Sequence, residues 1–338
     1  AKPSYYRCAA LYVIINRMKQ PTDYDSRIDI IRFFAFFLVF FTHFVNEGGN
    51  ALKQDLDVWW NNALLQRFAD FGGQGVPIFF ALTGFLLGRL LLKEFEDTNT
   101  ISIRCFFLRR ILRIWPLYFL FFLICLAANP FASNTPAINS SEIPYYLTFT
   151  YNWGQIFSQI PGSMATITWS VSVEEQIYLI LPFLLSIPIK NRFQRISIFF
   201  ILIGSISLFY SKSGALFSAS RSTLSYLLPV GIGLFIAIHE GYFRKRRECN
   251  FWFKLLVLFT LPVYIFFFPL VKDSIFGDLF TMLLTSALFL ALLFLADHFT
   301  NPAKQIHKFI SRIGRISYGC YLYHWAIWTV MTGKEIFY

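Results

Sequence analysis

Residues 26–47 read SRIDIIRFFAFFLVFFTHFVNE, an almost uninterrupted apolar stretch that carries Asp29, Arg32 and His43 inside it or at its edge. Its length suits a helix that crosses a bilayer. On such a helix Arg32 and His43 share one face, about 16 Å apart, because eleven residues make close to three whole turns. Asp29 can pair with Arg32 across one turn, and an interfacial ion pair is one interpretation of both. A charged side chain facing lipid is costly, so this face is expected to look into the protein interior.

The composition of the chain indicates a polytopic membrane protein. Of its 338 residues, 56% are hydrophobic, only 14% are charged and 42 are Phe, which no soluble fold would hide. A net charge of +11 would suggest nucleic acid as a partner of a soluble protein. The sequence has no Lys- and Arg-rich soluble face with interleaved aromatic residues, so we expect no nucleic-acid binding.

Apolar runs of about 17 to 25 residues predict an all-α, polytopic transmembrane helix bundle of about 9 to 10 spans. Tyr145–Trp153 is aromatic but broken by polar residues, so we expect it to be interfacial; if it crosses, it is a tenth span. The nine predicted spans are Ile28–Asn46, Gly75–Leu92, Ile111–Ala128, Trp169–Ile187, Ile196–Tyr210, Leu224–His239, Phe251–Val271, Gly277–Asp297 and Ile316–Thr332.

The distribution of basic residues predicts the orientation of the bundle. Of the 30 Lys and Arg residues, 23 fall on the side of the amino terminus and six on the other, with Arg32 inside a span. The positive-inside rule then places the amino terminus in the cytoplasm. We expect a cytoplasmic amino-terminal segment at 1–27, a transmembrane domain at 28–332 and a short tail at 333–338.

A basic cluster precedes the third span in the sequence CFFLRRILRIWPLY, residues 105–118. Arg110 and Arg113 lie three residues apart on one helix face, with Arg109 beside them. Guanidinium groups suit phosphate because they bind it through two parallel hydrogen bonds and stay charged. Ordinary positive-inside anchoring is the alternative interpretation.

The sequence TWSVSVEEQIYLILP, residues 168–182, enters the predicted bilayer from the side of His43. Tyr178 follows Glu174 by four residues and Glu175 by three, so it can contact either carboxylate. Acidic residues at a helix start are also favoured by the helix dipole. Two carboxylates entering apolar surroundings remain costly, and a cationic partner such as an imidazolium would relieve that cost.

Two further motifs complete the pattern. In ISYGCYLYHWAIW, residues 316–328, His324 falls at mid-depth, where a buried, hydrogen-bonded histidine is the simpler interpretation. Gly84 and Gly88, four residues apart in GVPIFFALTGFLLG, predict close helix packing. The His and carboxylate spacing matches no zinc pattern, so we predict no metal site.

Taken in order, these motifs resemble the acyltransferase 3 family of integral-membrane acyltransferases, and the resemblance covers most of the chain. WSVSVEEQIY is the most specific of them. Pro77, Thr83 and Val171 depart from the family's usual residues, which bears on fine geometry rather than on activity. The carrying stretches are IDIIRFFAFFLVFFTH, GVPIFFALTGFL, RRILRIWPLY, WSVSVEEQIY and ISYGCYLYH.

The resemblance implies transfer of an acyl group, most often acetyl, from cytoplasmic acyl-coenzyme A to a hydroxyl of an envelope or exported saccharide. It also implies location in the bacterial inner membrane, with the carbohydrate acceptor entering from outside. We expect His43 to be the catalytic residue and Glu174 or Glu175 to orient it. The coenzyme would be held by Arg32, Arg109, Arg110 and Arg113. Substrate binding or structural support is expected from Asp29, Trp169, Ser170, Tyr178 and His324.

Two alternatives stay open at this stage. His43 can act as a general base on the acceptor hydroxyl or as a transient acyl carrier. The competing class is a transporter or exporter of a saccharide or lipid-linked intermediate, whose path would be lined by the same Arg32, His43 and Glu pair. The sequence does not distinguish acetyl from succinyl donors, nor does it give the oligomeric state.

Overall fold

The computed structural model describes residues 25–47, 63–129, 136–211, 221–245, 250–271, 274, 276–296 and 305–332. Within these residues the regular elements are all α-helices, as the sequence predicts. Most of the predicted amino-terminal segment 1–27 and the tail 333–338 lie outside them. The helices are α2 (Ser26–Glu47), α4 (Ala63–Gly72), α5 (Gly75–Thr98), α6 (Ile103–Ala128), α7 (Ile143–Leu147), α8 (Tyr151–Phe157), α9 (Thr168–Ser186), α10 (Arg192–Phe209), α11 (Thr223–Ile238), α12 (Glu240–Lys245), α13 (Asn250–Val271), α14 (Gly277–Leu295) and α15 (Gln305–Thr332).

Each of the nine predicted spans coincides with one of these helices to within two residues or lies inside it. Among the described residues, four helical segments are long and apolar enough to cross a membrane: Ser26–Asn46, Leu65–Thr98, Ile103–Ala128 and Arg192–Phe209. Shorter apolar helices occur at Thr223–Ile238 and Gly277–Leu293. The segment expected at the interface forms α7 and α8, of five and seven residues, which are too short to span. The number of crossings and the orientation stay predictions.

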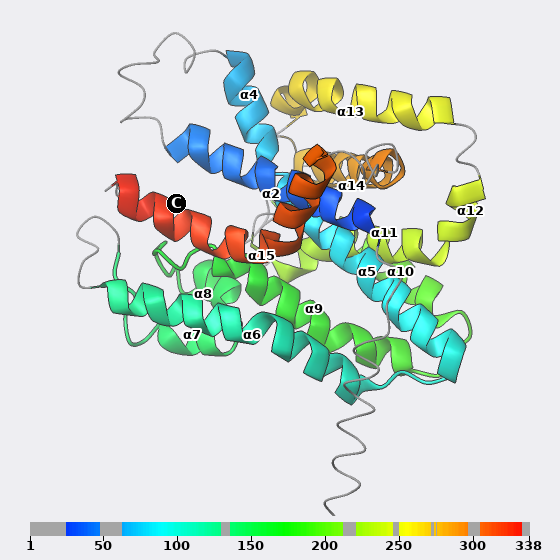
Figure 1. Ribbon diagram of the computed structural model, residues 1–338, viewed down its shortest axis with the longest axis horizontal. Helices are drawn as coiled ribbons and strands as arrows, with labels where there is room; N and C mark the ends of the chain where they lie inside the picture. Colours follow the sequence, from blue (N-terminus) through cyan, green and yellow to red (C-terminus); the bar gives the residue numbers. More distant parts are fainter. Residues whose placement is uncertain are drawn as a thin grey trace, which may run out of the picture.

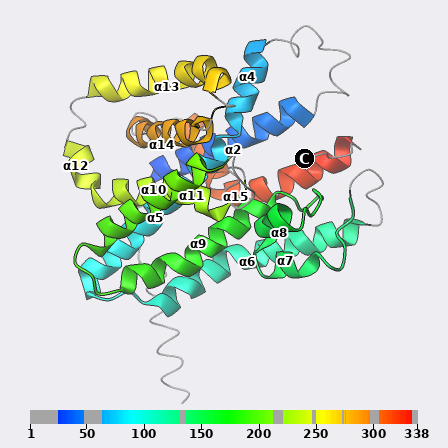
Figure 2. The same cartoon turned by 180° about the vertical axis from the view of Figure 1, so that it is seen from behind.

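The helices form one bundle in which α2 and α15 lie side by side (Figure 1). α11 packs between α5 and α10, and α13 packs on α14 at one edge of the bundle. The opposite edge is made by α6 and α9 with the short helices α7 and α8, as the view from behind also shows (Figure 2). The helices α2 and α15 lie between these two edges (Figure 1).

Close packing of α5 on α11 depends on glycine, which confirms the prediction for the second span. A Cβ on Gly84 would lie 2.1 Å from the carbonyl oxygen of Val230. A Cβ on Gly233 of α11 would lie 1.9 Å from the carbonyl oxygen of Ala81. Each helix therefore presents a glycine to the backbone of the other, so the two axes approach more closely than side chains would allow.

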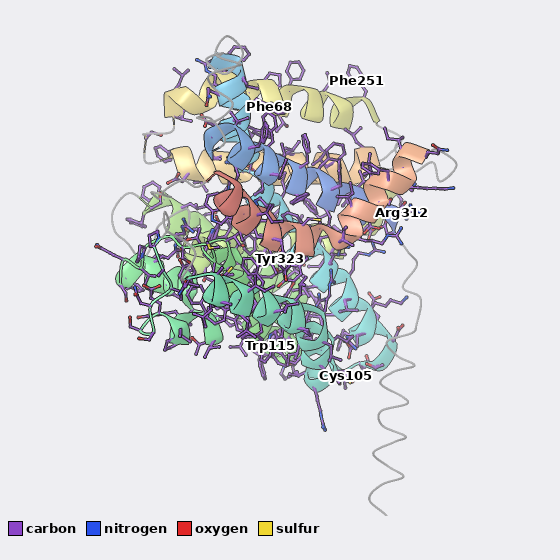
Figure 3. The ribbon with its side chains drawn as sticks, turned by 60° about the vertical axis from the view of Figure 1, so that its left-hand side comes forward. Phe68, Cys105, Trp115, Phe251, Arg312 and Tyr323 are labelled. Carbon is purple, nitrogen blue, oxygen red and sulfur yellow. The ribbon has the colours of Figure 1, made fainter. Side chains whose placement is uncertain are left out.

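The outer surface of the bundle is strongly apolar. Leu120 and Leu123 of α6 are more than half exposed, and so are Phe251 and Phe266 of α13. Phe251 projects from the edge of the bundle and Trp115 lies on α6 in Figure 3. Exposed apolar side chains on several long helices are what a lipid-facing surface requires, since water would disfavour them. The chain is therefore an integral membrane protein.

A cluster of ion pairs ties the start of α2 to α5 and α12. Asp25 accepts hydrogen bonds from Arg27 Nη2 at 2.6 Å and from Arg89 Nη1 at 3.0 Å, and Arg89 Nε lies 3.3 Å from Glu240 Oε2. Burial raises the pKa of the Asp25 carboxyl, but the hydrogen bonds and charges of Arg27 and Arg89 outweigh burial and leave that pKa below its usual value. The helix end that leads into the Arg32–His43 face is thus anchored electrostatically.

Candidate active site

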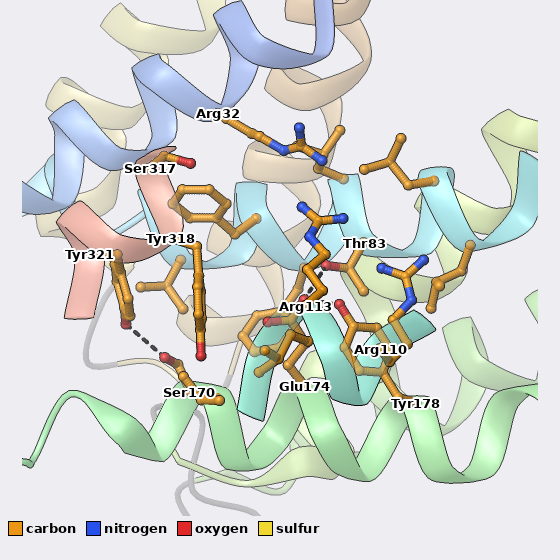
Figure 4. A pocket seen from close by; sticks show the side chains of 18 of the residues that line it. Arg32, Thr83, Arg110, Arg113, Ser170, Glu174, Tyr178, Ser317, Tyr318 and Tyr321 are labelled. Carbon is orange, nitrogen blue, oxygen red and sulfur yellow. Dashed lines mark hydrogen bonds between the residues drawn. The ribbon is translucent and has the colours of Figure 1, made fainter. Parts of the chain in front are cut away.

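A cavity of about 110 Å³ lies between α2, α5, α6, α9 and α15. Four guanidinium groups border it, and we call it the arginine cavity. Figure 4 shows Arg32 entering it from α2 and Arg110 and Arg113 reaching it from α6. Its polar lining residues are Arg32, Thr83, Arg110, Arg113, Ser170, Glu174, Tyr178, Arg315, Ser317, Tyr318 and Tyr321.

The arginine cavity carries excess positive charge. Asp29, only 3% exposed, accepts a hydrogen bond from Arg32 Nη1 at 3.2 Å, and its other oxygen lies 3.7 Å from Arg315 Nε. Among the described residues neither Arg110 nor Arg113 has an acidic partner within 4 Å. The buried Nε of Arg110 has no hydrogen-bond partner there either. Guanidinium groups without an acidic partner or a complete set of hydrogen bonds are suited to binding an anionic ligand.

One residue of the predicted coenzyme-binding set lies outside the arginine cavity, and its role in binding stays a prediction. Arg109 does not line the cavity; its Nη2 lies 3.4 Å from Glu94 Oε2 of α5, in an ion pair between helices. Arg315 of α15 takes a place in the lining that the sequence did not assign to it. The signal that could have found it is its position directly before the ISYGCYLYH motif.

Glu174 and Glu175 lie on the side of the arginine cavity, not beside His43. Glu174 accepts hydrogen bonds from Tyr178, as the spacing allows, and from Thr83 Oγ1 at 3.1 Å. Glu175 accepts one from Trp115 Nε1 at 3.2 Å, while its second carboxylate oxygen is buried without a partner among the described residues. Neither carboxylate hydrogen-bonds to His43, so the expected orientation of His43 by a glutamate is not what the structure shows. Any other catalytic role of the pair stays a prediction.

A second cavity, of about 310 Å³, contains His43, and we call it the histidine cavity. Val76 of α5 lines both cavities. Besides His43, three aromatic side chains and one basic side chain line the histidine cavity: Trp169, Tyr226, Trp325 and Arg221. Its lining residues are Val39, Thr42, His43, Asn46, Gly73, Val76, Thr166, Ile167, Trp169, Arg221, Tyr226 and Trp325.

The hydrogen-bond partner of His43 is His324 of α15. His43 Nδ1 lies 3.0 Å from His324 Nε2, and the two rings stack with centroids 5.1 Å apart and an interplanar angle of 16°. Trp325 packs its ring edge-on against His43, at 4.6 Å between centroids. Among the described residues the second ring nitrogen of His43, Nε2, has no hydrogen-bond partner.

Helices α2 and α9 both serve the two cavities, in opposite order along the chain. α2 contributes Arg32 to the arginine cavity and, eleven residues on, His43 to the histidine cavity. α9 contributes Glu174 to the first and Trp169 to the second. Tyr321 of α15 and Ser170 of α9, which both line the arginine cavity, hydrogen-bond at 2.7 Å. The predicted face of α2 therefore joins two chambers aligned along the bundle.

In the part of the chain that the structure describes, no group of three or more His, Cys, Asp and Glu side chains could hold a metal ion. The residues that gather at the site are instead guanidinium groups at one end and an imidazole pair at the other. The guanidinium groups can bind an anion. The imidazole pair, a short distance away, can move a proton or carry an acyl group.

An integral-membrane helix bundle with a cationic cavity next to a cavity that contains a histidine is compatible with acyl transfer from an anionic donor. The chain belongs to the acyltransferase 3 family: the family model described as "Acyltransferase domain" matches residues 25–337. Membership of this family favours an enzyme over a transporter, as the motifs predict.

Curated relatives carry related names. "Putative O-acetyltransferase SACOL0978" of Staphylococcus aureus is 26% identical over 282 residues, 76% of this chain and 46% of the relative. "Putative acetyltransferase ORF330" of Acidianus two-tailed virus is 26% identical over 89% of this chain and 83% of its own length. "Peptidoglycan O-acetyltransferase OatA" of Listeria monocytogenes is 28% identical over 36% of this chain and 21% of its own length.

The chain spans about half the length of the staphylococcal relatives it matches, at 46%. No solved structure matches the chain. The family and the relatives thus support an O-acetyltransferase of the membrane, and the donor and acceptor have to be argued from the site itself.

Proposed function

We propose that the protein is a membrane O-acyltransferase that moves an acyl group, acetyl in the first instance, from acyl-coenzyme A in the arginine cavity to a saccharide hydroxyl in the histidine cavity. The observation that carries this proposal is the pair of adjacent cavities that share Val76, one cationic and one built around His43. A donor and an acceptor from opposite sides of a membrane need two such chambers.

The arginine cavity suits the charged part of the donor. Coenzyme A carries phosphate groups, and guanidinium groups bind phosphate with paired, charge-assisted hydrogen bonds. Arg110 and Arg113 would supply these bonds, with Arg32 and Arg315 further along the same wall. By the positive-inside prediction this chamber faces the cytoplasm of a bacterial inner membrane, where acyl-coenzyme A is made.

The chemical step centres on His43. Its Nε2 takes the proton from the acceptor O–H, and the oxygen bonds to the thioester carbonyl carbon. The C–S bond then breaks, and the proton passes from Nε2 to the departing sulfur, which leaves an ester and a coenzyme A thiol. In the alternative relay, His43 Nε2 bonds to the thioester carbonyl carbon and the C–S bond breaks to release coenzyme A thiolate. The acyl group then passes from Nε2 to the acceptor oxygen, whose proton goes to the thiolate.

The lining of the histidine cavity suits a sugar acceptor. Trp169, Tyr226 and Trp325 offer aromatic surfaces on which the apolar faces of a sugar ring can pack, and Thr42 and Asn46 offer hydrogen bonds to hydroxyl groups. One relative bears the name of a peptidoglycan O-acetyltransferase. We therefore propose an envelope or exported saccharide as the acceptor class.

The direct test is consumption of labelled acetyl-coenzyme A by the purified full chain in nanodiscs, with a crude envelope glycan extract as acceptor. We expect release of free coenzyme A that rises with added extract, together with transfer of label into the glycan fraction. A transporter has no cause to break a thioester. Absence of thioester loss with acetyl, propionyl and succinyl donors, in protein shown to be folded, would contradict the proposal.

The shared position of Val76 gives a second prediction. Val76→Trp places a large ring where the two cavities meet, so the thioester would no longer reach His43. We expect transfer to fall by about 100-fold, the order of loss that follows from a misplaced reacting group. Binding of coenzyme A, measured by calorimetry, should persist.

The matched control for this substitution is Val76→Ala, which removes bulk without closing the path. It should keep transfer close to the wild-type rate. Equal rates for the Trp and wild-type proteins would show that the acyl group does not pass Val76, and the two-chamber assignment would fail.

A further inference from the structure

His43 and His324 form a hydrogen-bonded chain that ends on a backbone carbonyl. His324 Nδ1 lies 2.6 Å from the carbonyl oxygen of Tyr321, one turn earlier in α15. His324 Nε2 lies 3.0 Å from His43 Nδ1. Two successive hydrogen bonds therefore connect the backbone of α15 to the imidazole of α2.

The Tyr321 carbonyl at the end of this series of hydrogen bonds determines which ring nitrogens carry a hydrogen. A carbonyl oxygen only accepts, so His324 Nδ1 must carry the hydrogen that it receives. In a neutral His324 the lone pair is then on Nε2, which makes this atom an acceptor for His43 Nδ1–H. His43 must consequently hold its lone pair on Nε2, the nitrogen without a partner among the described residues.

The surroundings keep His324 in its neutral form. Its ring is 9% exposed and meets the rings of Phe36 and Phe40 at centroid distances of 5.9 and 6.2 Å. A charged imidazolium is disfavoured among such neighbours unless a counter-charge is present.

We propose that His324 is a positioning residue that fixes the tautomer and the ring plane of His43, so that His43 Nε2 is the basic nitrogen presented to the acceptor hydroxyl. This inference rests on the proposed function, in which His43 is the reacting group. His324 thereby takes the orienting role expected of Glu174 or Glu175, with a backbone carbonyl in place of a carboxylate. When Nε2 receives a proton, the hydrogen bond from Nδ1 becomes charge-assisted and stronger.

Two substitutions separate the hydrogen bond from packing. His324→Phe keeps a ring against Phe36 and Phe40 but has no acceptor for His43 Nδ1–H. His324→Gln can place its Oε1 near the former Nε2 and accept that hydrogen. We expect kcat to fall by at least about 100-fold in His324→Phe, with the KM for acetyl-coenzyme A unchanged, and to recover to within about tenfold of wild type in His324→Gln.

A matched control comes from the same helix. His307 is a second buried histidine of α15, and its ring nitrogens have no hydrogen-bond partner among the described residues. It lines neither cavity. His307→Phe should therefore leave kcat unchanged, and an equal loss in His307→Phe and His324→Phe would assign the effect to helix packing and overturn the inference.

The tautomer itself can be read without any turnover. The full chain with ¹⁵N-labelled histidine, studied by NMR in nanodiscs, should show the His43 proton on Nδ1, with the signal assigned by its loss in His43→Ala. In His324→Phe the proton should move to Nε2 in part of the population. A wild-type spectrum with the proton on Nε2 would overturn the inference even if transfer depends on His43. If the wild-type protein shows the expected tautomer but no acyl transfer, the proposed function is contradicted and the tautomer assignment stands.

Discussion

Replacing His43 by alanine is expected to abolish acyl transfer, with a loss of at least about 1000-fold in coenzyme A release, within the range that general acid–base catalysis supplies. The reason is geometric: His43 lines the histidine cavity, where we propose that the acceptor binds, and its Nδ1 faces His324, which leaves Nε2 for a substrate. The measurement is the labelled acetyl-coenzyme A assay in nanodiscs, with variants matched for folding by size-exclusion chromatography and thermal unfolding.

His239, at the carboxyl end of α11, provides the control because it lines neither cavity and packs on Phe235. His239→Ala should turn over normally. The same assay also separates the two chemical routes: stable label on wild-type protein in the absence of acceptor, lost in His43→Ala, would establish the relay. Normal turnover by His43→Ala would remove His43 from the mechanism altogether.

The fold was largely predictable because long apolar runs determine where helices lie in a membrane protein. The helical segments that the sequence did not predict contain more polar and charged residues. α4 was not expected, and α15 begins at Gln305, eleven residues before the predicted start at Ile316. This first part of α15 contains Lys308, Arg312 and Arg315, so its hydropathy resembles that of a loop. Its helical state depends on packing against α2, where Gly314 meets the backbone of Asp29.

The site was predictable where one helix carries it and unpredictable where two helices meet. Arg32 and His43 lie on a common face of α2, so the helical period alone links the two chambers. The position of α9 in the predicted bilayer puts the glutamates on the side of His43. Glu174, however, follows Trp169 by five residues, about 7.5 Å along the helix axis, and therefore lines the arginine cavity while Trp169 lines the histidine cavity. That His324 meets His43 depends on how α15 packs on α2, which no local pattern encodes.

Arg110→Gln is expected to raise the KM for acetyl-coenzyme A by about 10- to 100-fold, since a hydrogen bond to a charged group contributes about 1.5–3 kcal/mol. Glutamine keeps hydrogen-bonding capacity but removes the charge. The Arg110 guanidinium lies over the ring of Tyr178 at 5.1 Å and has no acidic oxygen within 4 Å among the described residues, which leaves it available to phosphate. Since His43 is untouched, kcat should change little, and the effect should weaken as salt concentration rises.

The neighbouring Arg109 provides the matched control, because it is also an arginine of α6 but does not line the arginine cavity. Arg109 pairs with Glu94 outside the cavity, so Arg109→Gln should leave the KM for acetyl-coenzyme A near the wild-type value. A second donor isolates the phosphates: acetyl-pantetheine lacks them, and its KM should be the same for Arg110→Gln and wild type. If Arg110→Gln raises the KM for both donors by the same factor, Arg110 shapes the cavity and does not bind phosphate. A larger effect in Arg109→Gln than in Arg110→Gln would place the donor outside the arginine cavity.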